Sequence, residues 1–280
     1  MASQSFVPRQ SELGKKSTYT SLYNPDILFP IARSSQRIEI GVDSSDLPFK
    51  GFDYWNHYEV SWLNEWGKPI VALAEIVYDC QSTYMIESKS LKLYFNTLNN
   101  TRFKTLEDVT LLVKKDLSMR MGTDVFVAIM PIETIQHAPL VIAPQGVCLD
   151  SLDIDCFDYT TKPSLLTTES DHVEERLYSN LLKSNCLVTH QPDWGTIEIH
   201  YEGKKINRAH LLAYIISYRN HYEFHEQCIE RIFMDVMTQC QPNKLTVYGR
   251  YTRRGGLDIN PYRSTEASDF KHKNIRLIRQ

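Results

Sequence analysis

The first half of the chain alternates between strand-like and helix-like hydrophobic patterns. Residues 57–63 and 69–78 are rich in aromatic and β-branched residues, and the Asn-Glu-Trp-Gly turn signal between them predicts a hairpin. In residues 88–98 and 105–117 the apolar positions recur at helical spacing instead, and residues 124–131 return to a strand pattern. The predicted order is therefore strand, strand, helix, helix, strand.

The second half repeats much of this order. Residues 196–201 alternate like a strand, which we expect to pair with the segment around Leu187 across an Asp-Trp-Gly turn. Asn207 is a candidate cap for a first helix, and residues 224–240 carry apolar side chains at helical spacing for a second. Residues 245–251 then form a strand. Two tandem copies of one unit are the simplest account.

The repeat predicts an α+β fold in which helices pack on one face of antiparallel sheets. We expect an N-terminal arm over residues 1–45, a first module over 46–140, a crossover over 141–170 and a second module over 171–280. The second module is expected to open with a helix at residues 171–182.

Composition narrows the class of protein. The chain has 280 residues, of which 42% are hydrophobic and 23% charged, and its net charge is −3. These values are typical of a globular protein without a bulk surface for nucleic acid or membrane. The apolar runs are too short for a membrane span and the N-terminus lacks an apolar signal core, so we expect a cytoplasmic protein with reduced cysteines. Its six cysteines include no C-x-x-C pair, which argues against structural zinc.

The stretch SNCLVTHQPDWG carries the strongest candidate chemistry. Cys186 lies seven residues before Asp193, and a nucleophilic thiolate needs a neighbour that holds or moves its proton. Pro192 forbids a regular helix, so a bend can return Asp193 to the sulfur. The alternative is a buried structural cysteine before a surface turn, and spacing alone favours that alternative.

Three further stretches carry polar candidates. The run HEQCI lacks the second histidine of a zinc-binding H-E-x-x-H, so Glu226 is either a helix-end charge or an acceptor for ring N–H groups. In Arg253-Arg254-Gly255-Gly256, glycine permits close approach of a phosphate that arginine neutralises, although no Rossmann fingerprint is present. For Lys89 and Lys92, spacing favours a solvated helix face.

Four stretches together resemble one family. In chain order they are ESKSLKLY (87–94), SNCLVTHQPDWG (184–195), FHEQ (224–227) and YTRRGGLDINPYR (251–263). They resemble the motifs of the QueF family, the NADPH-dependent 7-cyano-7-deazaguanine reductases, and the length is similar to the long, two-module form. The resemblance implies tandem tunnelling-fold (T-fold) modules, a homodimer, a small-molecule substrate, and no direct nucleic-acid or membrane partner.

The resemblance also implies roles for particular residues. The nucleophile would be Cys186 and the proton donor Asp193, with His190 left a structural role. The substrate would contact Ile86, Glu87, Ser88, His225 and Glu226. The cofactor NADPH would be held by Ser88, Lys89, Arg254 and Gly255, and no metal is implied.

The implied reaction reduces the nitrile of 7-cyano-7-deazaguanine (preQ0) to 7-aminomethyl-7-deazaguanine (preQ1) with two NADPH, through a thioimide on Cys186, in queuosine biosynthesis for tRNA. Two other classes remain open. One is a hydrolase, either on the same scaffold, as in GTP cyclohydrolase, or a cysteine nitrilase. The other is a module that binds pterins or deazapurines without catalysis. A nitrilase would release a carboxylate instead of an amine, and a binding module would not consume NADPH.

Overall fold

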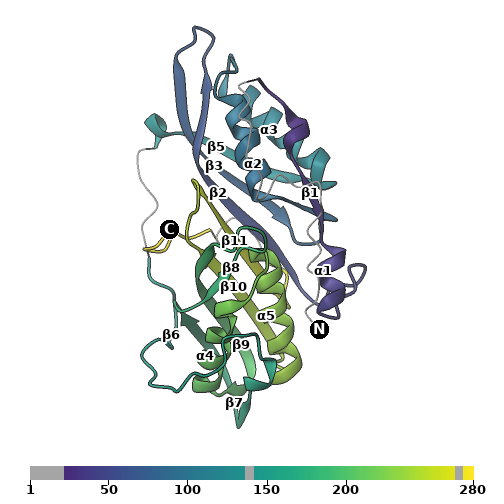
Figure 1. Cartoon of the computed structure of the whole chain (residues 1–280), viewed down its shortest axis with the longest axis vertical. Helices are drawn as coiled ribbons and strands as arrows, with labels where there is room; N and C mark the ends of the chain where they lie inside the picture. The colour runs from purple at the N-terminus through teal and green to yellow at the C-terminus, as the bar shows by residue number, and fades with distance from the viewer. Residues whose placement is uncertain (1–21, 136–141, 269–273) are drawn as a thin grey trace.

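A single nine-stranded sheet forms the body of the molecule (Figure 1). The computed structural model describes residues 22–135, 142–268 and 274–280. The strand order is β5-β3-β2-β11-β10-β9-β7-β6, with β8 paired to β9, and only the short β6–β7 pairing is parallel. The strands are β2 Lys50–Leu63, β3 Pro69–Asp79, β5 Val125–Pro131, β6 Val147–Cys148, β7 Thr168–Ser179, β8 Lys183–Asn185, β9 Pro192–Ile206, β10 Lys244–Tyr251 and β11 Leu257–Ser264.

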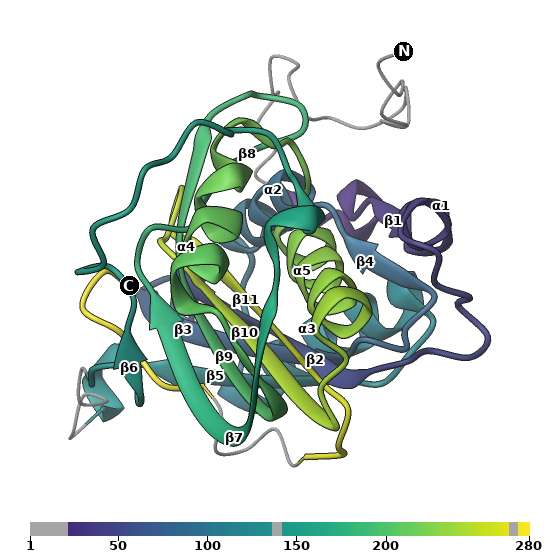
Figure 2. The same ribbon diagram turned by 90° about the horizontal axis from the view of Figure 1, so that it is seen from below.

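The helices lie on one face of this sheet, as Figure 2 shows, which confirms the predicted α+β class with tandem T-fold modules. In the first module, the β2–β3 hairpin is followed by α2 (Ser88–Leu98), α3 (Leu106–Met121) and β5, in the predicted order. In the second, Asn207 caps α4 (Arg208–Ser217) by accepting a hydrogen bond from the His210 N–H, as predicted. Helix α5 (His225–Cys240) and β10 follow.

The helix predicted at residues 171–182 is wrong. This segment forms β7, whose backbone pairs with β9 over most of its length. Val173 and Leu177 are four residues apart, a spacing that fits one face of a strand as well as one face of a helix. Because the intervening residues are charged helix formers, local sequence favoured the helix, and pairing with β9 decided the outcome.

Two other expectations in the second module needed correction. Strand β9 begins at Pro192, so the predicted Asp-Trp-Gly turn lies inside the strand, and the chain reverses over residues 186–191 instead. Strand β11 was not predicted at all. Pro261 lies near its centre and cannot donate to a ladder, which argues against a central strand from sequence alone.

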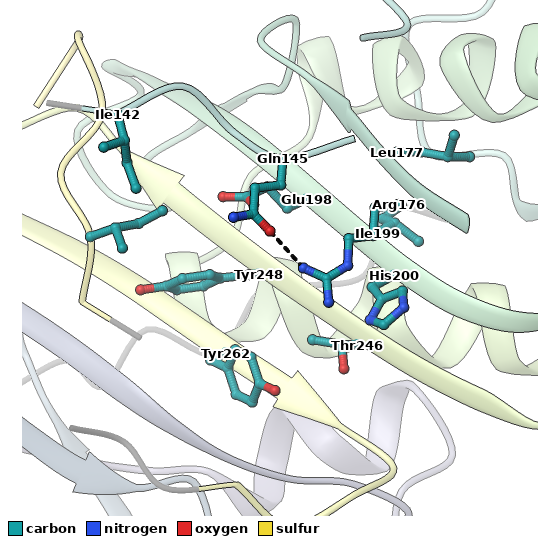
Figure 3. Close-up of a pocket in the computed structure, with 11 residues that line it drawn as sticks. Ile142, Gln145, Arg176, Leu177, Glu198, Ile199, His200, Thr246, Tyr248 and Tyr262 are labelled. Atoms are coloured by element: carbon teal, nitrogen blue, oxygen red, sulfur yellow. Dashed lines mark hydrogen bonds between the residues drawn. The ribbon is translucent and has the colours of Figure 1, made fainter. Parts of the chain in front are cut away.

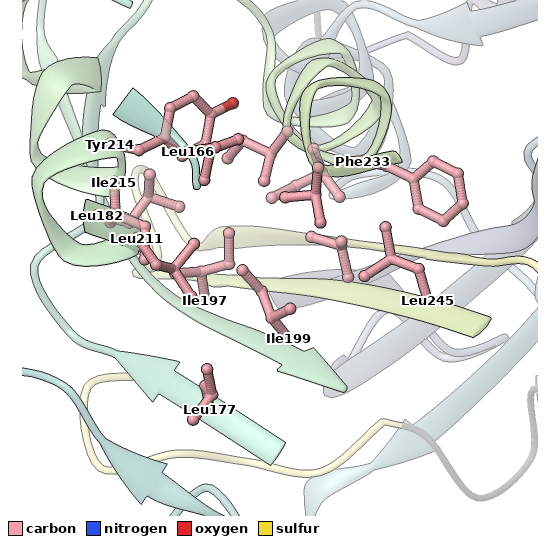
Figure 4. Close-up of a cluster of buried hydrophobic side chains, with 14 of the residues drawn as sticks. Leu166, Leu177, Leu182, Ile197, Ile199, Leu211, Tyr214, Ile215, Phe233 and Leu245 are labelled. Atoms are coloured by element: carbon pink, nitrogen blue, oxygen red, sulfur yellow. The ribbon is translucent and has the colours of Figure 1, made fainter. Parts of the chain in front are cut away.

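Strands β2 and β11 join the two modules. They pair antiparallel from Leu257 opposite His57 to Ser264 opposite Lys50. On the helix-covered face, each module keeps its own hydrophobic cluster. The second module's cluster includes Ile197, Ile199, Leu211, Tyr214 and Phe233 (Figure 4). The first module's cluster packs α2 and α3 against β2, β3 and β5 through Trp55, Ile76, Leu91, Phe95 and Val109.

The described part of the predicted arm is built into the fold. Residues 22–45 contain a short 3-10 helix η1 (Pro25–Ile27), β1 (Pro30–Ala32) and α1 (Ser34–Glu39), and β1 pairs with β4 (Tyr84–Ile86). Arg33 and Arg37 then enter a fully buried charge cluster, in which no side chain is more than 3% exposed. Arg33 pairs with Asp53 and Arg37 with Glu230 at 2.8 Å, while Arg263 reaches Asp53 at 2.8 Å and Glu230 at 2.9 Å.

No helix in the part of the chain that the structure describes is long and apolar enough to cross a membrane.

The cluster predicts a large stability effect at its centre. Glu230→Gln should lower the free energy of unfolding by about 3 kcal/mol, because it leaves buried arginines without their carboxylate. Chemical denaturation measures the change. The matched control is Glu202→Gln, which removes an exposed ion pair with Lys244 and should have little effect. Equal effects of the two substitutions would contradict a structural role for the cluster.

Candidate functional site

A cavity lies where the two modules meet, and its empty space, counted together with the part open to solvent, is about 340 Å³. The first module contributes β4, the start of α2 and the middle of β2. The second contributes the loop after β8, the start of α5 and the turn between β10 and β11. The lining residues are Trp55, Met85, Ile86, Ser88, Cys186, Asp193, Glu223, Phe224, His225, Glu226, Arg254 and Ile259. The structure therefore brings together residues from all four motif stretches.

Cys186 lies directly after β8, at the start of the tight loop that returns to β9. The loop is closed by hydrogen bonds from the Cys186 N–H to the Gln191 carbonyl at 2.9 Å and from the His190 N–H to the Cys186 carbonyl at 3.1 Å. His190 closes the loop in a left-handed conformation, with φ at 56°. Its ring packs edge-on against Tyr222 and does not line the cavity, in keeping with the structural role expected for it.

The loop also sets the acidity of the thiol. Burial raises the pKa of Cys186, whose side chain is only 5% exposed. Hydrogen bonds from the hydroxyl and backbone N–H of Thr189 and from the backbone N–H of Val188 outweigh that burial. With a further hydrogen bond from Arg254, the pKa of Cys186 lies below its ordinary value, so this thiol loses its proton more readily than an ordinary cysteine.

Asp193 is the second residue of β9 and lies opposite Ser184 of β8. Its carboxylate lies 3.3 Å from Nε2 of His225 and 3.2 Å from Nη2 of Arg254. Burial raises the pKa of Asp193, but His225, Arg254 and Lys92 together bring it below the ordinary value. The carboxylate is therefore ionised at neutral pH and can accept a proton.

Arg254 ties the β10–β11 turn to the cysteine loop. Besides Asp193, its guanidinium donates to the Gln191 side chain at 2.8 Å and to the Thr189 hydroxyl at 3.3 Å. The next residue, Gly255, has φ at 60°, and a Cβ there would lie 3.2 Å from Nζ of Lys92. The turn is thus in close contact with α2, which begins at Ser88 and Lys89.

Of the four predicted cofactor residues, Ser88 and Arg254 line the cavity, Gly255 lies in the turn that contacts α2 through Lys92, and Lys89 is the second residue of α2. A glycine-containing turn with basic side chains nearby suits a phosphate-bearing cofactor. The prediction that the lysines lie on a solvated helix face is wrong for Lys92. This side chain is half-buried against the turn, and burial, with Arg254 nearby, lowers its pKa.

His225 and Glu226 are the first two residues of α5. The His225 ring stacks on Tyr251 with centroids 3.9 Å apart, and its buried Nδ1 makes no hydrogen bond within the described residues. Glu226 is 2% exposed. Burial raises the pKa of Glu226 to about 7, and the charge of Asp53 acts in the same direction, while Arg33 and His225 oppose it. Glu226 is thus a buried acceptor whose charge depends on its neighbours.

Glu87 is placed differently from the other predicted substrate contacts. Ile86 and Ser88 line the cavity, but the Glu87 carboxylate caps α2, accepting the N–H groups of Lys89 at 2.6 Å and Ser90 at 2.8 Å. Burial raises its pKa above the ordinary value despite these hydrogen bonds. In this arrangement Glu87 supports the two residues beside it.

Several residues around the cavity were not predicted from the sequence. Trp55 and Ile259 lie directly opposite each other on β2 and β11, and both line the cavity. The buried Trp55 Nε1 has no hydrogen-bond partner among the residues described. Trp55 belongs to no motif stretch, and Ile259, although it lies within residues 251–263, is apolar and had no predicted role. Only the register of a strand that was not predicted could have placed them together.

A thiol of lowered pKa, an ionised carboxylate and a buried glutamate lie in one cavity, a combination that suits an enzyme with a nucleophilic cysteine. The chain belongs to the QueF family of nitrile reductases. Residues 19–129 match the family profile described as "Nitrile reductase, 7-cyano-7-deazaguanine-reductase N-term", and residues 192–269 match that of "QueF-like protein".

Curated relatives cover almost the whole chain. The "NADPH-dependent 7-cyano-7-deazaguanine reductase" of Legionella pneumophila (strain Corby) is 60% identical over 274 residues, covering 98% of this chain and 96% of the relative. Proteins of the same name from Polaromonas sp. (strain JS666 / ATCC BAA-500) and Coxiella burnetii (strain CbuK_Q154) are each 51% identical. The alignments cover 98% of this chain and 99% of the Polaromonas protein, and all of both chains for Coxiella.

The loop geometry predicts how Cys186 reacts with an alkylating agent. The iodoacetamide rate at Cys186 should rise with a midpoint below that of an ordinary thiol, about 8.5. Burial instead raises the pKa of Cys80 and Cys228 to about 12, so these should stay unmodified. Thr189→Val should move the Cys186 midpoint to higher pH. Site-resolved mass spectrometry across pH measures both effects.

The control is Thr246→Val, which removes a hydroxyl paired with Ser264, far from this loop in the sequence. An unchanged Cys186 midpoint in Thr189→Val would show that the loop does not set the acidity of the thiol.

Proposed function

We propose that this protein reduces the nitrile of 7-cyano-7-deazaguanine to the aminomethyl group of 7-aminomethyl-7-deazaguanine, using two NADPH, in queuosine biosynthesis for tRNA. The observation that carries the proposal is that Cys186, Asp193 and Glu226 line one cavity between the modules. The names of relatives that are 51–60% identical over nearly the whole chain support the same substrate and cofactor.

The cavity suits the ring of this substrate. Its pyrimidinone edge offers adjacent N–H donors, and a carboxylate such as Glu226 can accept two of them. Trp55 Nε1 and His225 Nδ1 are buried polar atoms without partners in the described structure, so polar atoms of a bound ring would satisfy them. Ile86 and Ser88 line the cavity from the first module and complete the proposed substrate contacts. Glu87 would hold these two residues in place by capping α2. It would contact the substrate only if its carboxylate released the N–H groups of Lys89 and Ser90.

The first chemical step uses Cys186 and Asp193. The sulfur adds to the electrophilic nitrile carbon, forming a C–S bond and converting C≡N to a C=N thioimide. The nitrogen needs one proton, and the thiol loses one. An ionised Asp193 can take the proton from sulfur and deliver it to nitrogen, so charge and atoms balance without any other reactant.

NADPH supplies hydride to the C=N carbon when it is bound. Ser88, Lys89, Arg254 and Gly255 would hold the cofactor, with the basic groups at its phosphates. Asp193, kept next to His225, would take up one proton from water before each reduction and pass it to the nitrogen. After the first reduction the C–S bond breaks, which returns the Cys186 thiolate and leaves an imine for the second. The cavity walls should shield this imine from hydrolysis.

Mixing the protein and the nitrile without NADPH should give an adduct on Cys186 with the full mass of the substrate, because addition expels nothing. With NADPH, absorbance at the nicotinamide band should fall and the amine should appear by mass. Cys186→Ala should abolish adduct and turnover, while Cys148→Ala, at a half-buried cysteine, should keep both. A carboxylate product would indicate a nitrilase, and ligand binding without NADPH oxidation would indicate a binding module.

We further propose a cytoplasmic homodimer, with the helix-free face of the sheet as the contact. This face carries the partly exposed Phe126 and Met130 of β5 and a hollow of about 830 Å³ lined by Arg176, Glu198 and Tyr248, among others (Figure 3). A buried Glu198 oxygen makes no hydrogen bond within the described residues. A second copy would cover these groups and the edge strand β5. All six cysteines are free, as expected for a reducing compartment.

Light scattering at working concentration should give twice the chain mass of 32.6 kDa. Met130→Lys should weaken the dimer because it places a charge in the proposed contact. Met119→Lys, at an exposed methionine of α3 on the helical layer, is the control and should leave the mass unchanged. A monomeric mass for the unmodified protein would exclude the dimer.

A further inference from the structure

The buried charge cluster is connected to the cavity through Glu226. Glu226 lines the cavity and lies on the same helix as Glu230 of the cluster. Two carboxylates, Asp53 and Glu230, are held by three arginines, Arg33, Arg37 and Arg263, which leaves one positive charge in excess. Glu226 supplies the third carboxylate, one helical turn before Glu230 on α5. With an ionised Glu226 the formal charges of the group balance, although Glu226 has no direct arginine partner in the described structure.

Tyr78 connects Glu226 to this cluster. It lies on β3, is 3% exposed, and its hydroxyl makes a long hydrogen bond of 3.5 Å to Oε1 of Glu226. The Arg33 guanidinium lies over the ring of the same Tyr78, 5.6 Å from the ring centre. Trp55, which lines the cavity, packs on the same ring with centroids 6.1 Å apart. Tyr78 is therefore fixed between the cavity wall and Arg33.

Arg33 is itself fixed by the N-terminal segment. It directly follows β1, and its guanidinium pairs with Asp53 and donates to the Ser82 hydroxyl at 3.1 Å. No motif stretch includes it, and sequence patterns placed it in an arm of unassigned role. Its position just before a short helix is explained by neither the hydrophobic core nor the chemistry of Cys186.

We propose that Arg33 is a positioning residue for substrate binding, which acts through Asp53 and Tyr78 to keep the Glu226 carboxylate charged and directed at the ring N–H groups. The proposal rests on the proposed function for the identity of the ring. It assigns a binding role to the N-terminal segment, whose described residues 22–45 are not part of the cavity lining. Arg33 is not a catalytic residue, because it touches neither the cavity nor Cys186.

The physical reason is electrostatic. The charged or titratable groups that face Glu226 come from five elements: Tyr78 of β3, Asp53 of β2, Arg33 before α1, Arg263 of β11, and His225 and Glu230 of α5 itself. Burial and Asp53 raise the pKa of Glu226 to about 7, and Arg33 limits that rise. Only the charged form accepts two N–H bonds, so affinity should fall as pH drops through this value. Without Arg33, the loss should begin at higher pH.

The first experiment follows Glu226 directly in the protein without ligand. Its carboxyl carbon is observed by NMR in protein labelled with 13C-glutamate and assigned with Glu226→Gln. Arg33→Met should raise the titration midpoint by about one pH unit, since nearby charges commonly act at this scale. Arg33→Lys, which keeps the charge, should restore it. Arg37→Met is the matched control, because Arg37 is equally buried but pairs with Glu230 and not Asp53; it should leave the midpoint in place.

The second experiment measures turnover with the nitrile. At pH 6.5, Arg33→Met should raise KM about tenfold with little change in kcat, and the effect should shrink at pH 8.5. Tyr78→Phe, which removes one hydroxyl and keeps the ring, should also raise KM and leave kcat unchanged. If Arg33→Met does not fold, the KM of Tyr78→Phe tests the proposal in its place.

An unmoved Glu226 midpoint in Arg33→Met, or equal shifts in Arg33→Met and Arg37→Met, would overturn the proposal. So would a KM in Tyr78→Phe equal to that of the unmodified protein. Failure of the unmodified protein to oxidise NADPH with the nitrile would refute the proposed function instead, and the NMR midpoints would still decide the role of Arg33.

Discussion

The pairing of β2 with β11 is the interaction on which the site depends. It joins two modules that each have their own hydrophobic cluster, and it fixes their register to the residue. A slip of one position would place Trp55 and Ile259 on opposite faces of the sheet. The start of α2 would then no longer meet the cysteine loop. Neither module holds a complete cavity, so the register of one strand pair sets the geometry of the whole site.

The buried charge cluster reinforces this junction. Asp53 comes from β2, Arg263 from β11 and Glu230 from α5, so these ion pairs link both modules across the same strand pair. A buried charge group needs all of its members, because each one left unpaired is costly. Arg33 and Arg37 complete it from the N-terminal segment. Stability at the junction and charge balance beneath Glu226 therefore depend on the same few side chains.

Local sequence patterns predicted much of the fold and the chemical centre of the site. Helices with clear apolar spacing were placed correctly: α5 was predicted to within one residue at its start, and α3 was predicted at its start but continues four residues past its expected end. Cys186, Asp193 and Glu226 were selected because their stretches resemble the motifs of one family, since spacing alone favoured a structural cysteine. The three residues do line one cavity. Strand β7 was mistaken for a helix because its apolar residues are four apart and its charged residues favour helices.

What sequence could not predict depends on contacts between distant segments. Trp55 and Ile259 meet only through strand register, and Tyr78 matters because Glu226 and Arg33 approach it from other elements. Lys92 looked solvated because its own helix does not cover it, and the turn that does lies far along the chain. No window of local sequence contains these relations, since each is decided by how the modules pack.

The strand order has a consequence for how the molecule is made. Asn56 of β2 and Asp258 of β11 are hydrogen-bonded neighbours separated by 202 positions in sequence. During synthesis, the first module emerges with one long edge of β2 unpaired, and its partner strand follows only after these intervening positions have been made. Such distant contacts slow folding and leave an open strand edge able to pair wrongly. The newly made first half must therefore wait with an exposed edge, which makes this stage the one most prone to aggregation and most dependent on chaperones.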